Sequence, residues 1–206
     1  MTAQAGDTFP DSMLALRAQL RSRLRQQRRQ LPPELRQRAP RTAATRLLRS
    51  AALRGARHIA VYLASPVELD TAPLIERLHR RGCHLYAPVV QHHGEMHWIE
   101  LPPRHTRGLR RDAKGLRCPS ARRPRRLARQ LDAVIMPLLG FDEYGSRLGT
   151  GGGFYDRAFA FRRHCSRPKL IGYAFAAQQV DRIPVEPWDV PLDAIVTERE
   201  FLRRRR

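Results

Sequence analysis

Cysteine is scarce in this chain: it has three, Cys83, Cys118 and Cys165, and they lie far apart. An odd, widely spaced set argues against a disulfide framework or a cysteine-based zinc site, and it fits a reducing compartment. Long apolar runs are also missing, since none approaches the roughly 20 residues that span a bilayer. Residues 1–11 lack the charged-then-apolar pattern of a secretory signal. We therefore expect a cytoplasmic protein without a membrane segment.

Acidic residues are few, with 19 Asp and Glu against 39 Lys and Arg, so the formal net charge is +20. Such a charge attracts polyanions, including nucleic acids, nucleotides and polycarboxylated small molecules. The arginines are spread along the whole chain, which is equally consistent with an ordinary charged surface. Aromatic-studded strands of the kind that stack RNA bases are absent. A basic nucleotide- or RNA-binding module without turnover stays open as an alternative function.

The length of 206 residues suits one α/β domain. Short apolar runs alternate with helical patterns, which predicts an open, mostly parallel, Rossmann-like sheet flanked by helices. We expect a disordered leader over residues 1–11, a single domain over residues 12–202 and a basic, disordered tail over residues 203–206. The predicted strands cover residues 58–63, 84–90, 96–100, 133–136, 169–175 and, as the last strand, 194–197.

Helical patterns fill much of the rest. Leu16, Leu20 and Leu24 recur every four residues and predict an amphipathic helix over residues 13–30. A second helical region opens at Pro32 and Pro33, and Pro40 is expected to break it, with a further helix over residues 41–53. Other helices are predicted over residues 71–81 and 154–163. The basic, proline-rich stretch 104–126 is predicted to be a long surface connection.

One stretch stands out, because five glycines fall within the nine residues from Gly145 to Gly153. They follow a predicted buried strand and precede a predicted helix, an arrangement that presents backbone N–H groups and a positive helix end to an anion. Arg147 adds a positive charge, and Asp156 could hold a metal. The stretch matches neither the Walker A pattern nor the dinucleotide fingerprint. A phosphate-binding loop and a flexible surface turn both stay possible on spacing alone.

The same stretch resembles the signature of the 5-formyltetrahydrofolate cyclo-ligase family, also called methenyltetrahydrofolate synthetases. The resembling residues are Phe141, Asp142, Gly145, Arg147, Leu148, Gly149, Gly151, Gly153, Phe154, Tyr155 and Asp156. The resemblance extends over about residues 17–197. It implies an ATP- and Mg²⁺-dependent ligase that cyclises 5-formyltetrahydrofolate to 5,10-methenyltetrahydrofolate and releases ADP and phosphate. ATP would be a co-substrate, no nucleic acid would be required, and we expect a monomer.

The resemblance also implies roles for individual residues. The ATP-binding set would be Arg17, Arg21, Arg147, Leu148, Gly149, Thr150, Gly151, Gly152, Gly153, Phe154 and Tyr155. The folate-binding set would be Leu63, Glu68, Thr150, Gly151, Gly152, Gly153 and Phe154. Asp156 and Asp189 would bind Mg²⁺. Some relatives carry Lys where this chain has Gly152, so more of the phosphate binding would fall to Arg147 and the backbone.

Three carboxylates have more than one possible role. Asp189 and Asp193 together form either a metal-binding or a structural pair. Asp156 could stabilise the first turn of its helix rather than bind a metal. If the metal role holds, Asp156→Asn should leave the melting temperature nearly unchanged and remove Mg²⁺-dependent turnover.

Overall fold

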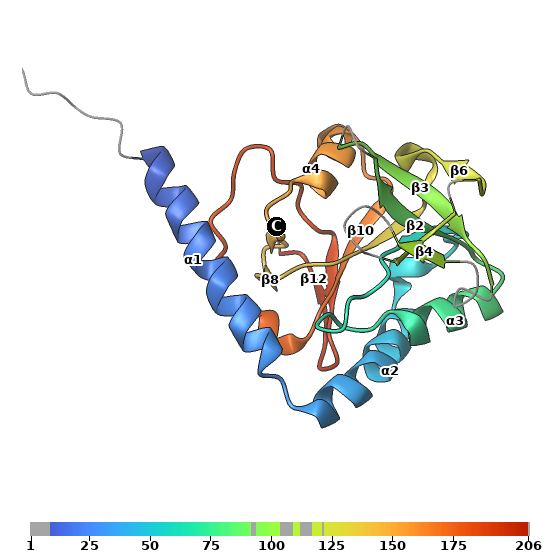
Figure 1. The fold of residues 1–206 in the computed structure, drawn as a ribbon, viewed down its shortest axis with the longest axis horizontal. Coiled ribbons are helices and arrows are strands. Elements are labelled where there is room, and N and C mark those ends of the chain that lie inside the picture. Colours follow the sequence, from blue (N-terminus) through green and yellow to red (C-terminus); the bar gives the residue numbers. More distant parts are fainter. Residues whose placement is uncertain (1–8, 92–93, 104–108, 112–116, 121, 206) are drawn as a thin grey trace, which may run out of the picture.

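The computed structural model describes residues 9–91, 94–103, 109–111, 117–120 and 122–205, and an eight-stranded sheet organises them (Figure 1). The strand order is β12-β11-β10-β7-β1-β2-β3-β6. The five strands from β11 to β2 run parallel, and β12, β3 and β6 are each antiparallel to their neighbours. These strands are His58–Val61 (β1), His84–Val90 (β2), Met96–Leu101 (β3), Arg125–Arg126 (β6), Ala133–Met136 (β7), Lys169–Tyr173 (β10), Ala194–Val196 (β11) and Phe201–Arg203 (β12).

The central strands form where the sequence is continuously apolar, because both faces of this part of the sheet are covered. All four residues of β7 are buried, and its Val134 pairs with Ala60 of β1 on one side and with Leu170 of β10 on the other. Strands buried on both faces lack the alternation of polar and apolar residues that a half-exposed strand shows. The predicted mostly parallel sheet flanked by helices is therefore confirmed.

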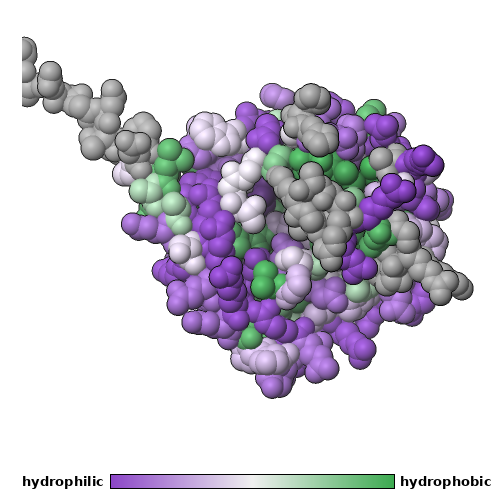
Figure 2. All heavy atoms as spheres, in the orientation of Figure 1, coloured by the Kyte–Doolittle hydropathy of each residue, from purple (hydrophilic) through white to green (hydrophobic). Residues whose placement is uncertain are grey.

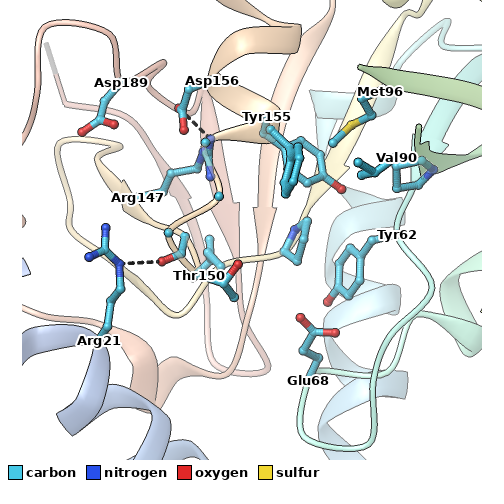
Figure 3. A pocket seen from close by; sticks show the side chains of 18 of the residues that line it. Arg21, Tyr62, Glu68, Val90, Met96, Arg147, Thr150, Tyr155, Asp156 and Asp189 are labelled. Atoms are coloured by element: carbon cyan, nitrogen blue, oxygen red, sulfur yellow. Dashed lines mark hydrogen bonds and ion pairs between the residues drawn. The ribbon is translucent and has the colours of Figure 1, made fainter. Parts of the chain in front are cut away.

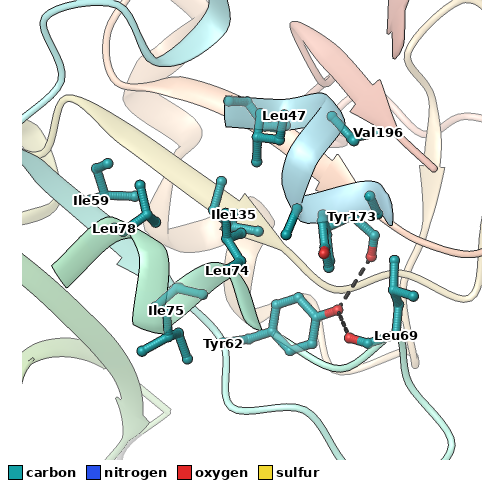
Figure 4. Close-up of a cluster of buried hydrophobic side chains, with 14 of the residues drawn as sticks. Leu47, Ile59, Tyr62, Leu69, Leu74, Ile75, Leu78, Ile135, Tyr173 and Val196 are labelled. Atoms are coloured by element: carbon teal, nitrogen blue, oxygen red, sulfur yellow. Dashed lines mark hydrogen bonds between the residues drawn. The ribbon is translucent and has the colours of Figure 1, made fainter. Parts of the chain in front are cut away.

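The helices α2 (Pro33–Arg49) and α3 (Ala72–Arg80) cover one face of the sheet. Figure 4 shows Leu47 of α2 and Leu74 and Leu78 of α3 packed against Ile59 and Ile135 of the strands. The opposite face carries the short helix α4 (Phe154–Ala158) and the 3-10 helices η2 (Ala128–Gln130) and η3 (Ala160–Arg163). Between α4 and η3, Phe159 is fully buried, with its ring centroid 5.4 Å from that of Trp98.

The first helix, α1 (Phe9–Arg29), lies along one side of the molecule, apart from α2 and α3 (Figure 1). It is anchored by Leu24, which is buried in a small cluster with Leu139, Leu148 and Ile183. It also contacts the 3-10 helix η4 (Ala176–Gln178). Because this attachment is narrow, α1 forms one wall of a hollow rather than a third layer of the core.

Proline does not interrupt α2, so the predicted break at Pro40 is wrong. Pro40 lies inside a continuous helix that ends at Arg49, and residues 51–53 form the separate 3-10 turn η1 (Ala51–Leu53). Proline removes one backbone hydrogen bond from a helix. Here Ala39, Pro40 and Ala43 are buried against the sheet, and the Tyr173 hydroxyl donates to the Pro40 carbonyl at 3.0 Å. Packing on this face outweighs the lost hydrogen bond.

The predicted helix over residues 154–163 is also wrong in its length. The α-helical part ends at Ala158, and Phe159, with φ −114° and ψ 16°, separates it from η3. The backbone turns at Phe159 while its ring remains buried beside Trp98 and Phe161. Tertiary packing of this ring has therefore overridden the helical periodicity of the sequence.

The structures predicted for the two termini of the chain need correction. Helix α1 begins at Phe9, so residues 9–11 belong to it rather than to a disordered leader; residues 1–8 lie outside the described part. The strand at residues 194–196 is not the last one, because β12 pairs antiparallel with it. Past β12, the N–H of Arg204 donates to Asp193 and that of Arg205 donates to Glu143, each at 3.2 Å. Residues 203–205 are therefore ordered, and Arg206 lies outside the described residues.

The basic stretch 104–126 is not a plain surface connection. Its described residues include the antiparallel pair β4 (Leu109–Arg111) and β5 (Arg117–Pro119), and β6 joins the main sheet beside β3. Cys118 of β5 is buried with Val89 and Ile99. Residues 104–108, 112–116 and 121 lie outside the part of the chain that the structure describes.

Candidate functional site

A pocket of about 600 Å³ opens between α1, the glycine-rich stretch and the carboxyl ends of β1 and β7. Tyr62 and Leu63 follow β1 into it, and Pro137 and Leu138 follow β7. In open α/β sheets, ligands bind at this edge. Figure 2 shows a mostly hydrophilic surface with apolar residues visible in the hollow beside α1. The site therefore combines an apolar interior with a charged rim.

A tight hairpin precedes the glycine loop. Its strands are β8 (Gly140–Phe141) and β9 (Arg147–Leu148). The buried carboxylate of Asp142 shapes the turn by accepting the backbone N–H groups of Tyr144 at 3.0 Å and Ser146 at 2.9 Å. Gly145 has φ 79°, and a Cβ there would lie 2.6 Å from the Leu192 carbonyl oxygen, so only glycine fits. Arg147, expected in the loop, instead occupies a strand with a fixed direction.

The loop itself covers residues 149–153. In the described structure, none of its backbone N–H groups donates a backbone hydrogen bond. Two of its carbonyl groups are occupied: Arg21 Nε donates to Gly149 at 3.2 Å, and Arg25 Nη2 donates to Thr150 at 3.1 Å. Gly151 and Gly153 have φ 113° and 60°, which favour glycine. With carbonyl groups held by α1, the loop keeps free N–H donors on the pocket wall, as an anion site requires.

Arg147 and Asp156 form an ion pair at the back of the loop. Arg147 Nη2 donates to Asp156 Oδ1 at 2.7 Å, and the N–H of Val190 donates to the same oxygen at 3.1 Å (Figure 3). The Arg147 guanidinium also lies 5.7 Å from the centre of the Tyr155 ring. Burial raises the pKa of the Tyr155 phenol, so this group is a neutral wall rather than a base. The phosphate-binding candidate and the metal-binding candidate are thus direct partners.

Arg17 and Asp189 form a second ion pair across the pocket mouth. Arg17 Nη1 donates to Asp189 Oδ2 at 2.6 Å and to the Pro184 carbonyl at 2.8 Å. One helical turn along, burial and the neighbouring charges of Arg17 and Arg25 lower the pKa of Arg21. Like charges this close are costly unless an anion lies between them. The α1 arginines therefore form a site for a negatively charged group.

Magnesium typically takes one or two protein carboxylates together with substrate phosphates and waters. Asp156 fits this role, since its Oδ2 accepts no hydrogen bond from the described residues, whereas Asp189 Oδ1 accepts one and Asp189 Oδ2 accepts two. Among the described residues, no three acidic, histidine or cysteine side chains form a metal-binding group. Asp193 takes the structural alternative: it binds Arg162 through both oxygens, at 3.0 and 2.8 Å, and does not line the pocket.

Glu68 lies at the opposite end of the pocket from the glycine loop, beside Tyr62 (Figure 3). Its Oε2 accepts the backbone N–H of Ser65 at 2.8 Å, which fixes the carboxylate. Of the residues to which the resemblance gives a binding role, Leu148 alone does not line the pocket; it is fully buried. The others converge on it: Arg17, Arg21, Leu63, Glu68, Arg147, Gly149, Thr150, Gly151, Gly152, Gly153, Phe154, Tyr155, Asp156 and Asp189.

Several lining residues were not identified from the sequence. Arg28 is buried, whereas Leu14 and Trp188 are more than half exposed at the mouth. The position of Tyr62 directly after the first strand could have indicated it, because strand ends form the ligand edge. Arg28 carried no such signal, since it is one of many arginines in α1 and tertiary contacts of the helix, such as the packing of Leu24, determine which of them are buried.

None of the helices in the described residues is long and apolar enough to span a bilayer. Known proteins resemble the chain over most of its length. It is 41% identical over 176 residues to the 5-formyltetrahydrofolate cyclo-ligase of Escherichia coli, covering 84% of this chain and 96% of that protein. The Haemophilus influenzae protein of the same name is 31% identical over 177 residues, with 85% and 94% covered.

Comparison of the fold with solved structures identifies proteins of the same activity. The solution structure of the 5,10-methenyltetrahydrofolate synthetase of Aquifex aeolicus superposes with a TM-score of 0.78 and 28% sequence identity, covering 93% of this chain and 94% of that one. The model of the 5-formyltetrahydrofolate cyclo-ligase family matches residues 14–198, which include both ion pairs, the glycine loop and Glu68. The chain therefore belongs to the 5-formyltetrahydrofolate cyclo-ligase family.

Proposed function

We propose that this protein is an ATP- and Mg²⁺-dependent ligase that converts 5-formyltetrahydrofolate to 5,10-methenyltetrahydrofolate. The observation that carries this proposal is the division of one pocket into two ends. A loop of free N–H groups and arginines lies at one end, and the fixed carboxylate of Glu68 lies at the other. The first end suits phosphates. The second suits the N–H donors of a pterin ring.

The chemistry matches the side chains in this pocket. The formyl oxygen is a poor leaving group, but transfer of the γ-phosphoryl group from ATP makes it a good one and releases ADP. The folate N10 then attacks the formyl carbon, loses its proton and forms the C–N bond as phosphate departs. Phosphoryl transfer depends on positioning and charge neutralisation more than on a protein nucleophile. The absence of a nucleophile from the proposed scheme therefore agrees with a site built of cations and N–H donors.

Under this proposal, different residues of the pocket bind ATP, the folate and Mg²⁺. Arg17, Arg21 and Arg147 and the N–H groups of the glycine loop would bind the phosphates of ATP. Tyr155, a neutral ring between the two ends, would orient the formyl group towards the phosphate. Glu68 and Leu63 would hold the pterin. Asp156, with Asp189 nearby, would hold Mg²⁺, which neutralises phosphate charge when bound.

We also propose that the enzyme acts as a monomer and needs no nucleic acid. We further propose a cytoplasmic location, because three widely spaced cysteines suit a reducing compartment.

The test is an absorbance assay for the methenyl product, run beside ADP measurement. One ADP should form per methenyl product, and omission of either substrate should abolish both signals. Arg147→Ala should lower kcat/KM for ATP by at least about tenfold, the value of one charge-assisted hydrogen bond. Lys169→Ala removes an exposed cation at the opposite end of β10 and should leave the rate unchanged. ATP binding without product would instead identify a nucleotide-binding module.

A further inference from the structure

Arg28 is a buried cation that nothing in the preceding scheme uses. It is 7% exposed and lines the pocket near the end of α1. Its guanidinium makes few contacts with the described residues: Nη1 donates to the Leu138 carbonyl at 3.5 Å, which is long for a hydrogen bond, and Nε has no partner. Among the described residues it forms no ion pair. Burying a guanidinium in this state is costly, since unmet donors lose their hydration.

A structural role does not account for this placement. The Leu138 carbonyl already accepts from Gln178 Nε2 at 2.8 Å, so it does not depend on Arg28. The other buried arginines of the pocket differ, because Arg17 is paired with Asp189 and Arg147 is paired with Asp156. Arg28 is thus the buried pocket arginine whose hydrogen bonds a ligand would complete.

The surroundings of Arg28 indicate which part of a bound ligand its guanidinium contacts. Burial lowers the pKa of Arg28, and the Glu68 carboxylate is the largest influence that opposes this. Glu68 Oε2 is held by Ser65, while Oε1 has no partner among the described residues. Both residues line the same pocket, so a donor and an acceptor are available to one ligand there. The pterin edge has the complementary pattern, with the 4-oxo group as acceptor beside N3–H and the 2-amino group as donors.

Building on the function proposed above, we propose that Arg28 donates to the 4-oxo group of the pterin while Glu68 accepts from N3–H and the 2-amino group. Arg28 is then a specificity-determining residue that selects 4-oxo pterins and fixes the ring so that the formyl group faces the loop. A 4-amino pterin would present a donor to the guanidinium, and donor against donor is rejected strongly in a buried site.

The experiment compares binding of 5-formyltetrahydrofolate with binding of its 4-amino analogue, for the wild type, Arg28→Gln and Arg29→Gln. Arg29 is the matched control, an exposed neighbour on the same helix that does not line this pocket. The wild type should prefer the 4-oxo ligand. Arg28→Gln should lower that preference by at least about tenfold and weaken 5-formyltetrahydrofolate binding, because one charge-assisted hydrogen bond is lost. ATP affinity should change by less than about twofold, and Arg29→Gln should match the wild type.

An unchanged preference in a folded Arg28→Gln protein would overturn the inference, as would equal losses for ATP and folate. Arg28→Lys keeps the charge and should retain part of the preference, which separates recognition from folding. The wild-type assay separates this inference from the proposed function. If the wild type forms no methenyl product, the proposed function fails; if it does and Arg28→Gln keeps its preference, only the role of Arg28 fails.

Discussion

Single side chains in this site serve two purposes at once. Asp156 neutralises the buried guanidinium of Arg147, and it is also the carboxylate best placed for a metal. The sequence suggested these as separate roles for separate residues. Their pairing means that a change at either one affects folding as well as catalysis, because removing one partner of a buried pair leaves the other uncompensated.

Asp156→Asn tests both purposes. The amide oxygen can still accept from Arg147 and Val190, but the charge is lost. We therefore expect a loss of about 2 kcal/mol without ligand, or roughly 4–8 °C in melting temperature for a domain of this size, contrary to the expectation from sequence alone. We also expect turnover at low Mg²⁺ to fall by at least about tenfold. A thermal melt and a Mg²⁺ titration of activity measure the two effects.

Asp193→Asn is the matched control, because Asp193 also pairs with an arginine but lies outside the pocket. It should lose stability while keeping the wild-type response to Mg²⁺. If Asp156→Asn showed that same combination, Asp156 would have a structural role only.

At the level of elements, helix α1 forms one side of the pocket and is not part of the main hydrophobic core. It contributes Arg17, Arg21 and Arg28 to the pocket, yet a small cluster around Leu24 holds it. The glycine hairpin is adapted to this contact, since a Cβ at Gly140 would lie 2.5 Å from Leu24 Cδ1. The position of three arginines therefore depends on this cluster together with the bonds of Arg17 to Asp189 and of Arg21 to Gly149.

Leu24→Ala should loosen α1 without unfolding the sheet. Deleting a buried leucine side chain costs about 2–5 kcal/mol, and here the loss falls on a peripheral element. We expect faster amide hydrogen exchange throughout α1 and a KM for ATP raised by at least about threefold. Hydrogen exchange and steady-state kinetics measure these changes.

Leu47→Ala makes the same substitution at an equally buried position of α2, against the main sheet. It should destabilise the whole domain and leave the KM for ATP unchanged in the folded protein. Identical exchange patterns in the two variants would show that α1 is an integral part of the core.

The sequence predicted elements well where local chemistry decided them. The apolar run Ala133–Met136 forms the central strand, and the glycines of residues 149–153 form a loop on the pocket wall. Prediction from the sequence failed where contacts between residues far apart in the chain determine the structure. Nothing near Pro40 shows that α2 will continue through it, and nothing near Arg17 shows its pairing with Asp189. Sequence patterns report local preferences, whereas these outcomes depend on residues far along the chain.

At the scale of the whole molecule, the net charge of +20 adds a long-range attraction to the local contacts. Both proposed substrates are polyanions, so the field should speed their encounter with the pocket. Added salt should therefore lower kcat/KM for ATP severalfold between about 20 mM and about 300 mM NaCl, while kcat changes little. Melting curves at each salt concentration control for stability. A kcat/KM that does not respond to salt would show that the charge has no part in capturing substrate.

The pocket joins the two halves of the polypeptide, and this affects when it can form. Arg17 bonds to Pro184 and Asp189, which follow it by 167 and 172 residues, and Arg21 bonds to Gly149 after 128 residues. A ribosome makes α1 first and its partners last, and contacts so distant in sequence form slowly. During synthesis, the arginines of α1 therefore lack their binding partners until nearly the whole domain has emerged from the ribosome. A nascent chain can therefore gain the proposed ATP-binding site only after Asp189 has emerged.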